Sequence, residues 1–102
     1  MDKKEVIKIV KTYAEIVKTQ FPVKHVILYG SYAKGIQQEH SDIDVAIVVD
    51  KVKGNWLSSK IKLFKLRRDI DPRIEPVLLE KDNDPSGFLE EIMKTGVIIY
   101  SS

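Results

Sequence analysis

The sequence places a glycine and a serine directly after a short apolar segment. Gly30 and Ser31 follow residues 26–29, which read Val-Ile-Leu-Tyr and have the length and β-branched start of a buried strand. Glycine at the end of a strand permits turn conformations and lets the backbone approach a ligand closely. Serine can offer both its amide and its hydroxyl to phosphate oxygens. We therefore expect a phosphate-binding turn at Gly30 and Ser31.

Two aspartates open the next apolar segment. Asp42 and Asp44 stand at the start of a strand that we expect from Ile43 to Val49. Side chains alternate across a strand, so residues two apart share a face, and both carboxylates should project from one edge of the sheet. Carboxylate oxygens are ligands that hard divalent cations prefer. The sequence thus predicts a metal site near the phosphate-binding turn.

The elements that position these residues follow from hydrophobic periodicity and breaker residues. Ser86 is expected to cap the last helix, Gly35 to end the short one, and Pro76 to mark an edge strand or a bulge. This alternation predicts an α/β or α+β domain with a small mixed sheet. The expected helices cover residues 2–20, 31–36, 56 to 69–72 and 86–94, and the expected strands cover residues 24–29, 43–49 and 73–80, with a short apolar run at 97–100.

Composition narrows the class of protein. The 102 residues suit one domain, 1–102, and the absence of cysteine excludes disulfides, zinc-thiolate sites and a cysteine nucleophile. The longest apolar runs are too short to cross a membrane, so we expect a soluble, cytoplasmic protein. A net charge of +2 is too small to argue for nucleic acid, which is not an expected partner of the isolated chain.

The basic residues are nevertheless unevenly distributed. Residues 51–68 contain seven lysines and arginines and no acidic residue. This segment is either the solvated face of a helix or a surface that binds an anion or a partner. The seven residues are Lys51, Lys53, Lys60, Lys62, Lys65, Arg67 and Arg68.

The two motifs together resemble a known signature. Gly-Ser at 30–31, ten intervening residues and Asp-Ile-Asp at 42–44 resemble the motif of the nucleotidyltransferase superfamily related to DNA polymerase β. The match is closest to its minimal nucleotidyltransferase (MNT) members and covers Val26 to Val49. The resemblance implies a polymerase-β-like fold, with a small mixed sheet flanked by helices.

The resemblance also implies roles for individual residues. Asp42 and Asp44 would be shared ligands of two Mg²⁺ ions, for which Mn²⁺ can substitute. Lys34 would meet the nucleotide triphosphate beside Gly30 and Ser31, although on composition alone it could be a solvent-facing residue. Tyr29 and Tyr32, which flank the turn, are expected only to pack in the core and at its rim.

A third carboxylate is expected from a later strand, where the superfamily usually has Asp. Glu75 stands at this place and is the candidate for the third catalytic and metal-binding position. Asp69, Asp71 and Glu80 remain alternatives, and Glu75 could instead be an exposed strand residue.

The function implied by the resemblance is transfer of a nucleoside monophosphate, with AMP from ATP as the expected case, to a hydroxyl. The resemblance implies a HEPN-domain toxin as partner, a tyrosine of which would be the acceptor, with this chain as the antitoxin in a hetero-oligomer or homo-oligomer. Two alternatives remain open: transfer to a small molecule of the aminoglycoside type, and a non-catalytic binding antitoxin or scaffold with a vestigial metal site.

Overall fold

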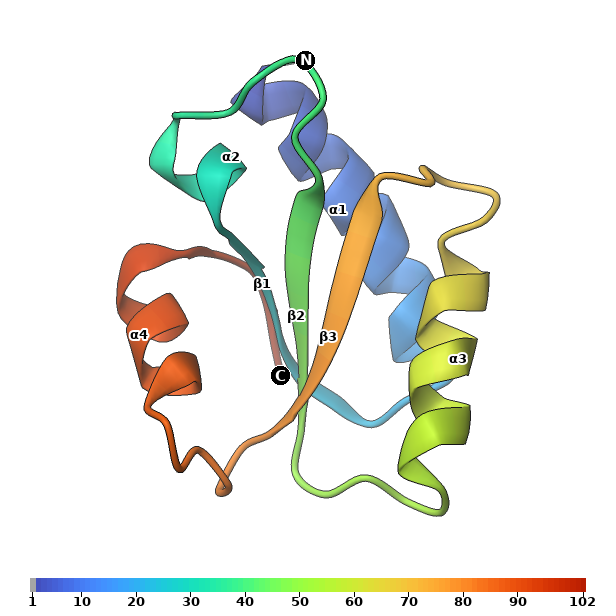
Figure 1. Cartoon of the computed structure of the whole chain (residues 1–102). Helices are drawn as coiled ribbons and strands as arrows, with labels where there is room; N and C mark the ends of the chain where they lie inside the picture. Colours follow the sequence, from blue (N-terminus) through green and yellow to red (C-terminus); the bar gives the residue numbers. More distant parts are fainter. Residues whose placement is uncertain (1) are drawn as a thin grey trace.

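A computed structural model describes residues 2–102 of the chain. Within these residues four strands form one mixed sheet in the order β3-β2-β1-β4, with helices on both faces (Figure 1). The expected α/β class with a small mixed sheet is confirmed. The elements are α1 (Lys3–Lys18), β1 (Val23–Tyr29), α2 (Ser31–Lys34), β2 (Ile43–Val49), α3 (Trp56–Leu66), β3 (Ile74–Glu80), α4 (Phe88–Thr95) and β4 (Val97–Ser101).

The sheet combines antiparallel and parallel pairs. Strand β1 pairs antiparallel with both β2 and β4. Strands β2 and β3 are parallel, and α3 makes the crossover that a parallel pair requires. Strand β3 lies at an edge of the sheet, as expected from Pro76, where a residue without an amide donor is tolerated.

Each face of the sheet covers its own hydrophobic cluster. The larger cluster lies between the sheet and helices α1 and α3, and includes Val10 and Val17 of α1 and Val45 and Ile47 of β2. The smaller cluster lies on the opposite face, where α4 packs on β1 and β2. Strand β2 is buried on both faces, and its one acidic residue, Asp44, lies near its N-terminal end.

A buried hydrogen bond joins the two helices of the larger cluster. The hydroxyl of Tyr13, in α1, donates to the carbonyl oxygen of Leu63, in α3, at 2.7 Å. Burial raises the pKa of Tyr13 well above its usual range, so this hydroxyl stays protonated and remains a donor. Leu63 is also the one buried residue of α3. The attachment of α3 to the core therefore depends on a narrow strip of the helix.

The helix termini differ in detail from the expectations. The carboxylate of Asp84, and not the hydroxyl of Ser86, caps α4, because it accepts from the amides of Leu89 and Glu90 at 2.9 and 3.0 Å. Gly87 adopts a positive φ of 76° at the helix start, and the Ser86 hydroxyl meets only the Phe88 amide, at 3.3 Å. A carboxylate satisfies two amides at once and favours the positive end of the helix dipole.

Three helices are also shorter than expected, and the first of them is α2, which ends at Lys34 rather than at residue 36. Helix α1 ends at Lys18 rather than Gln20, and α3 ends at Leu66 because residues 67–70 form turns. None of the helices within residues 2–102 is long and apolar enough to span a bilayer.

Candidate active site

Three polar side chains from three strands form a row at one end of the sheet. Asp44 of β2 lies opposite Tyr29 of β1 and opposite Glu75 of β3. Paired residues of neighbouring strands project from the same face, so these three side chains are neighbours. Asp42, two residues before Asp44, extends the acidic group along the same face. The register thus brings the predicted acids of the second and third strands together.

The side chains of this row affect one another's pKa values. Burial raises the pKa of Asp44, and the negative charges of Asp42 and Glu75 raise it further. Burial also raises the pKa of Tyr29, followed by the charges of Asp44 and Glu75. None of the ion pairs found between residues 2–102 includes Asp42 or Asp44. Asp44 is half-buried and Asp42 is exposed, and the absence of a cationic partner at either carboxylate within the described residues suits ligands of a divalent metal ion.

Gly30 joins the turn after β1 to this acidic row. Its backbone has φ 76° and ψ −149°, a conformation that L side chains rarely adopt. A Cβ atom at Gly30 would also lie 2.3 Å from Oδ2 of Asp44, which is far inside contact distance. The positive φ favours glycine here, and a Cβ atom would in addition displace the Asp44 carboxylate. The turn and the carboxylate therefore touch directly.

Helix α2 carries the other residues of the turn. Ser31 is its first residue and Lys34, which is exposed, is its last. Gly35 caps the helix in the left-handed conformation, with φ 72°, as expected from the sequence. The buried side chain of Tyr32 anchors the helix in the larger cluster, which also confirms an expectation. Ser31 is thereby held next to the contact between Gly30 and Asp44.

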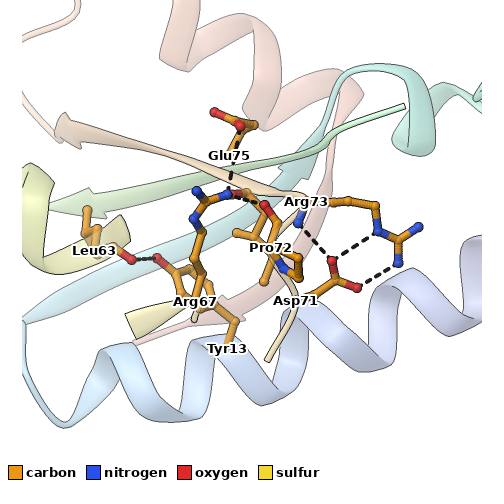
Figure 2. A network of polar contacts seen from close by, with 8 residues as sticks. Tyr13, Leu63, Arg67, Asp71, Pro72, Arg73 and Glu75 are labelled. Carbon is orange, nitrogen blue, oxygen red and sulfur yellow. Dashed lines mark hydrogen bonds and ion pairs between the residues drawn. The ribbon is translucent and has the colours of Figure 1, made fainter. Parts of the chain in front are cut away.

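Glu75 has a cationic neighbour of its own. Nη1 of Arg67 lies 4.0 Å from Oε1 of Glu75 and also donates to the carbonyl oxygens of Pro72 and Ile74, the latter at 3.0 Å (Figure 2). The Glu75 side chain is 45% exposed. In this arrangement no three His, Cys, Asp or Glu residues in the described part of the chain converge closely enough to hold a metal ion.

The alternative third carboxylates lie elsewhere. Asp71 forms an ion pair with Arg73 at 2.7 Å, and the hydrogen bond from Arg73 lowers the pKa of Asp71 (Figure 2). Glu80, at the opposite end of β3, accepts from the amide of Val52 at 2.9 Å. Asp69 is exposed in the turn after α3. Strand register therefore favours Glu75 over the other three.

Two residues of the site were not singled out from the sequence. Tyr29 was expected only to pack, and its ring does contact that of Phe88 edge-on, with centroids 5.3 Å apart. Its side chain also lies beside the carboxylates of the row. Its position directly before Gly30 was the available signal. Arg67 was one of seven basic residues in a run, and nothing local separates it from the others.

The comparison with protein families identifies the chain. The family described as "Polymerase beta, Nucleotidyltransferase" matches residues 11–102. The chain belongs to this family. It is a nucleotidyltransferase with the polymerase-β-like fold, as the spacing of its Gly-Ser and Asp-Ile-Asp motifs predicted.

Relatives from one archaeon have related names. The chain is 34% identical over 99 residues to "Putative protein adenylyltransferase MJ0141" of Methanocaldococcus jannaschii, a match that covers 91% of this chain and 97% of the relative. It is 40% identical over 61 residues to "Putative protein adenylyltransferase MJ1379" of the same organism, covering 60% of this chain and 61% of the relative. The chain thus resembles proteins named as adenylyltransferases.

Solved structures share the fold at lower sequence identity. A "putative nucleotidyltransferase" from Sulfolobus solfataricus has a TM-score of 0.70 and 23% identity, covering 97% of this chain and 83% of that one. A structure described as "the toxin-antitoxin with AMP-PNP" has a TM-score of 0.62 and 19% identity, covering 100% of this chain and 75% of that one. A mutant of the toxin-antitoxin MntA-HpeT has a TM-score of 0.58 and 16% identity, with the same coverage. These likenesses establish the fold.

The raised pKa of Asp44 makes a prediction about stability. Because the folded chain binds the Asp44 proton more tightly than the unfolded chain, the free energy of unfolding should fall as pH rises from 3.8 through the raised pKa. Asp44→Asn removes this titration and should flatten the fall in melting temperature between about pH 4 and pH 7, measured in EDTA.

Added Mg²⁺ should raise the melting temperature of the wild type at neutral pH and that of Asp44→Asn much less, since ligands that bind only the folded chain stabilise it. The exposed Asp82 serves as the matched control, and Asp82→Asn should behave as wild type. Identical pH profiles and Mg²⁺ responses for Asp44→Asn and wild type would show that Asp44 is not part of a cation site.

Proposed function

We propose that the chain is a magnesium-dependent protein adenylyltransferase. It transfers AMP from ATP to a hydroxyl, the acceptor being a tyrosine of a HEPN-domain toxin for which the chain is the antitoxin. The observation that carries this proposal is the direct contact of the Gly30 turn with Asp44, at the centre of an acidic row. One nucleotide with its bound metal can therefore contact both the turn, which suits phosphate, and the carboxylates, which suit metal.

The acidic row supplies the ligands for metal. Asp42, Asp44 and Glu75 are all carboxylates, which suits Mg²⁺ and, as a substitute, Mn²⁺. Bound at these residues, two ions would neutralise charge on the triphosphate and lower the pKa of the acceptor hydroxyl. Asp42 and Asp44 are the shared ligands in this proposal, and Glu75 moves away from Arg67 to become the third.

The remaining residues bind and orient the nucleotide. Gly30 admits the phosphates close to the backbone, Ser31 donates its amide and hydroxyl to them, and Lys34 neutralises the leaving pyrophosphate. The acceptor oxygen forms a bond to the α-phosphorus as the bond from this phosphorus to the pyrophosphate oxygen breaks, and the hydroxyl proton is released. Positioning and charge account for this reaction without a covalent intermediate on the chain.

The comparisons support the substrate and the partner in this proposal. Proteins named as adenylyltransferases are related over most of the chain, which favours AMP transfer to a protein. Two structures with the same fold are described as toxin-antitoxin proteins, and one of them is described with AMP-PNP, an analogue of ATP. A toxin partner and an adenine nucleotide are consistent with both descriptions.

One observation favours a second candidate function. Glu75 pairs with Arg67 and is a Glu where the superfamily usually has an Asp. In this second candidate, the ion pair with Arg67 keeps Glu75 from serving as the third metal ligand. The chain would then be a binding antitoxin with a vestigial metal site.

The first prediction concerns the shared ligands. Asp42→Asn and Asp44→Asn keep the size of the side chain and remove its charge, so AMP transfer from labelled ATP should fall about a hundredfold or more, equivalent to about 3 kcal/mol of lost transition-state stabilisation. Asp50, at the opposite end of β2, provides the control, and Asp50→Asn should retain transfer. Equal rates for wild type and Asp42→Asn in saturating Mg²⁺ would falsify the assignment.

The second prediction separates Lys34 from the metal ligands. Lys34→Ala should weaken ATP binding more than AMP binding in calorimetry, because the proposed contact is with the pyrophosphate portion. An equal loss for both nucleotides would place Lys34 on the solvated surface.

The third prediction distinguishes an enzyme from a binding antitoxin. Glu75→Gln should reduce AMP transfer and leave binding of ATP with Mg²⁺ nearly unchanged, since Asp42, Asp44 and the phosphates hold the ion bound to the triphosphate. Mass spectrometry of the partner, after incubation with wild type or Glu75→Gln, measures the added AMP. An unmodified partner in both reactions, with the toxin still neutralised, would leave the binding antitoxin as the function.

A further inference from the structure

Helix α3 turns apolar side chains toward solvent. Leu63 is the one buried residue among its eleven, whereas Trp56, Leu57 and Ile61 are 44%, 63% and 47% exposed. A short helix normally buries its apolar side chains, because packing supplies most of its stability. The exposed apolar face of α3 is therefore a candidate interaction surface.

This face is hollowed into a groove. A cavity of about 490 Å³ runs from Leu57, in the first turn of α3, to Pro72, in the turn beyond its end. Leu57, Ile61 and Phe64 line the cavity at i, i+4 and i+7, so they form one continuous stripe along the helix. A groove with an apolar stripe of this spacing suits the apolar face of another helix.

The charge around the groove selects the kind of helix. Lys60, Lys65 and Arg68 line it together with the apolar stripe, and residues 51–68 contain no acidic residue. None of these three takes part in the ion pairs found between residues 2–102. The groove therefore has an apolar stripe with unpaired cations on either side. A partner helix that complements it has an apolar stripe with carboxylates on either side.

The groove is joined to the acidic row by one residue. Arg67 lines the groove, stacks on the ring of Phe64 with its guanidinium carbon 5.0 Å from the ring centroid, and reaches Glu75 at 4.0 Å. A helix lying in the groove would thus be one side chain away from the row of carboxylates.

We propose that the groove of α3 binds an amphipathic helix of the acceptor protein, with leucine-type side chains on Leu57, Ile61 and Phe64 and carboxylates on the surrounding cations. The acceptor role of the bound protein rests on the proposed function; the binding of an acidic amphipathic helix does not. A helix docked there lies at the edge of the sheet next to Glu75. Its carboxylates compete with Glu75 for Arg67, so Glu75 is released toward Asp42 and Asp44.

A designed peptide tests the chemistry of the groove. The probe is a fluorescent helical peptide with leucines at i, i+4 and i+7 and glutamates at most other positions, and its binding is measured by anisotropy without ATP or Mg²⁺. We expect saturable binding that weakens about tenfold or more in Ile61→Glu and in the double variant Lys60→Glu/Lys65→Glu, since these changes remove apolar contact and charge complementarity. A matched peptide with lysine in place of glutamate should bind about tenfold more weakly or not at all.

Ile98 supplies the control variant. It is 45% exposed, close to the 47% of Ile61, but lies in β4 and away from α3. Ile98→Glu should bind the acidic peptide as wild type does, and circular dichroism verifies that each variant is folded. Absence of peptide binding, or equal loss in Ile98→Glu and Ile61→Glu, would overturn the proposal.

Other occupants of the groove are separate outcomes of the same experiment. Dimerisation of the chain that Ile61→Glu abolishes, or tight salt-resistant binding of random RNA through Lys60 and Lys65, would also overturn it. Asp42→Asn should bind the peptide as wild type does while losing AMP transfer. Peptide binding in the groove and AMP transfer are therefore measured independently, so either proposal can be contradicted without the other.

Discussion

The contact between Gly30 and Asp44 is the constraint on which the site depends. It brings the end of β1 against the start of β2, so a turn suited to phosphate and a carboxylate suited to metal share one small volume. A Cβ atom at Gly30 would lie 2.3 Å from Oδ2 of Asp44 and would force this carboxylate to move. The antiparallel pairing of β1 and β2 and the burial of Tyr32 in α2 both maintain this contact.

The same contact places the Asp44 carboxylate where its charge does not stabilise the fold. Asp44 is partly buried beside Asp42 and Glu75, and its raised pKa means that ionisation costs stability in the metal-free chain. The apolar residues of β2, buried on both faces, offset this cost. A destabilising cluster at the end of a well-packed strand is the arrangement expected of a binding site rather than of a structural one.

Arg67 connects this site to the outer surface of the molecule. It donates to carbonyl oxygens at the edge strand β3 and contacts Glu75 (Figure 2). It also stacks on Phe64 of α3. Helix α3 is itself attached through Leu63, the partly buried Leu66 and the hydrogen bond from Tyr13, which leaves Leu57 and Ile61 exposed. The groove and the carboxylates consequently share Arg67. Binding in the groove that moves Arg67 therefore changes the surroundings of Glu75.

The sequence by itself determined the local elements and the two motifs. Strand β2 begins and ends where periodicity predicted, and Gly35 caps α2 as expected. The spacing of the Gly-Ser and Asp-Ile-Asp motifs predicted the family. These predictions succeeded because each signal lies within a short stretch of the chain. Only the tertiary structure decided that Glu75, rather than Asp71 or Glu80, lies beside Asp44, since strand register joins residues that are 31 positions apart. It also decided the Asp84 cap, the Arg67 contact and the exposure of α3. Each of these depends on how elements pack, which no local pattern records.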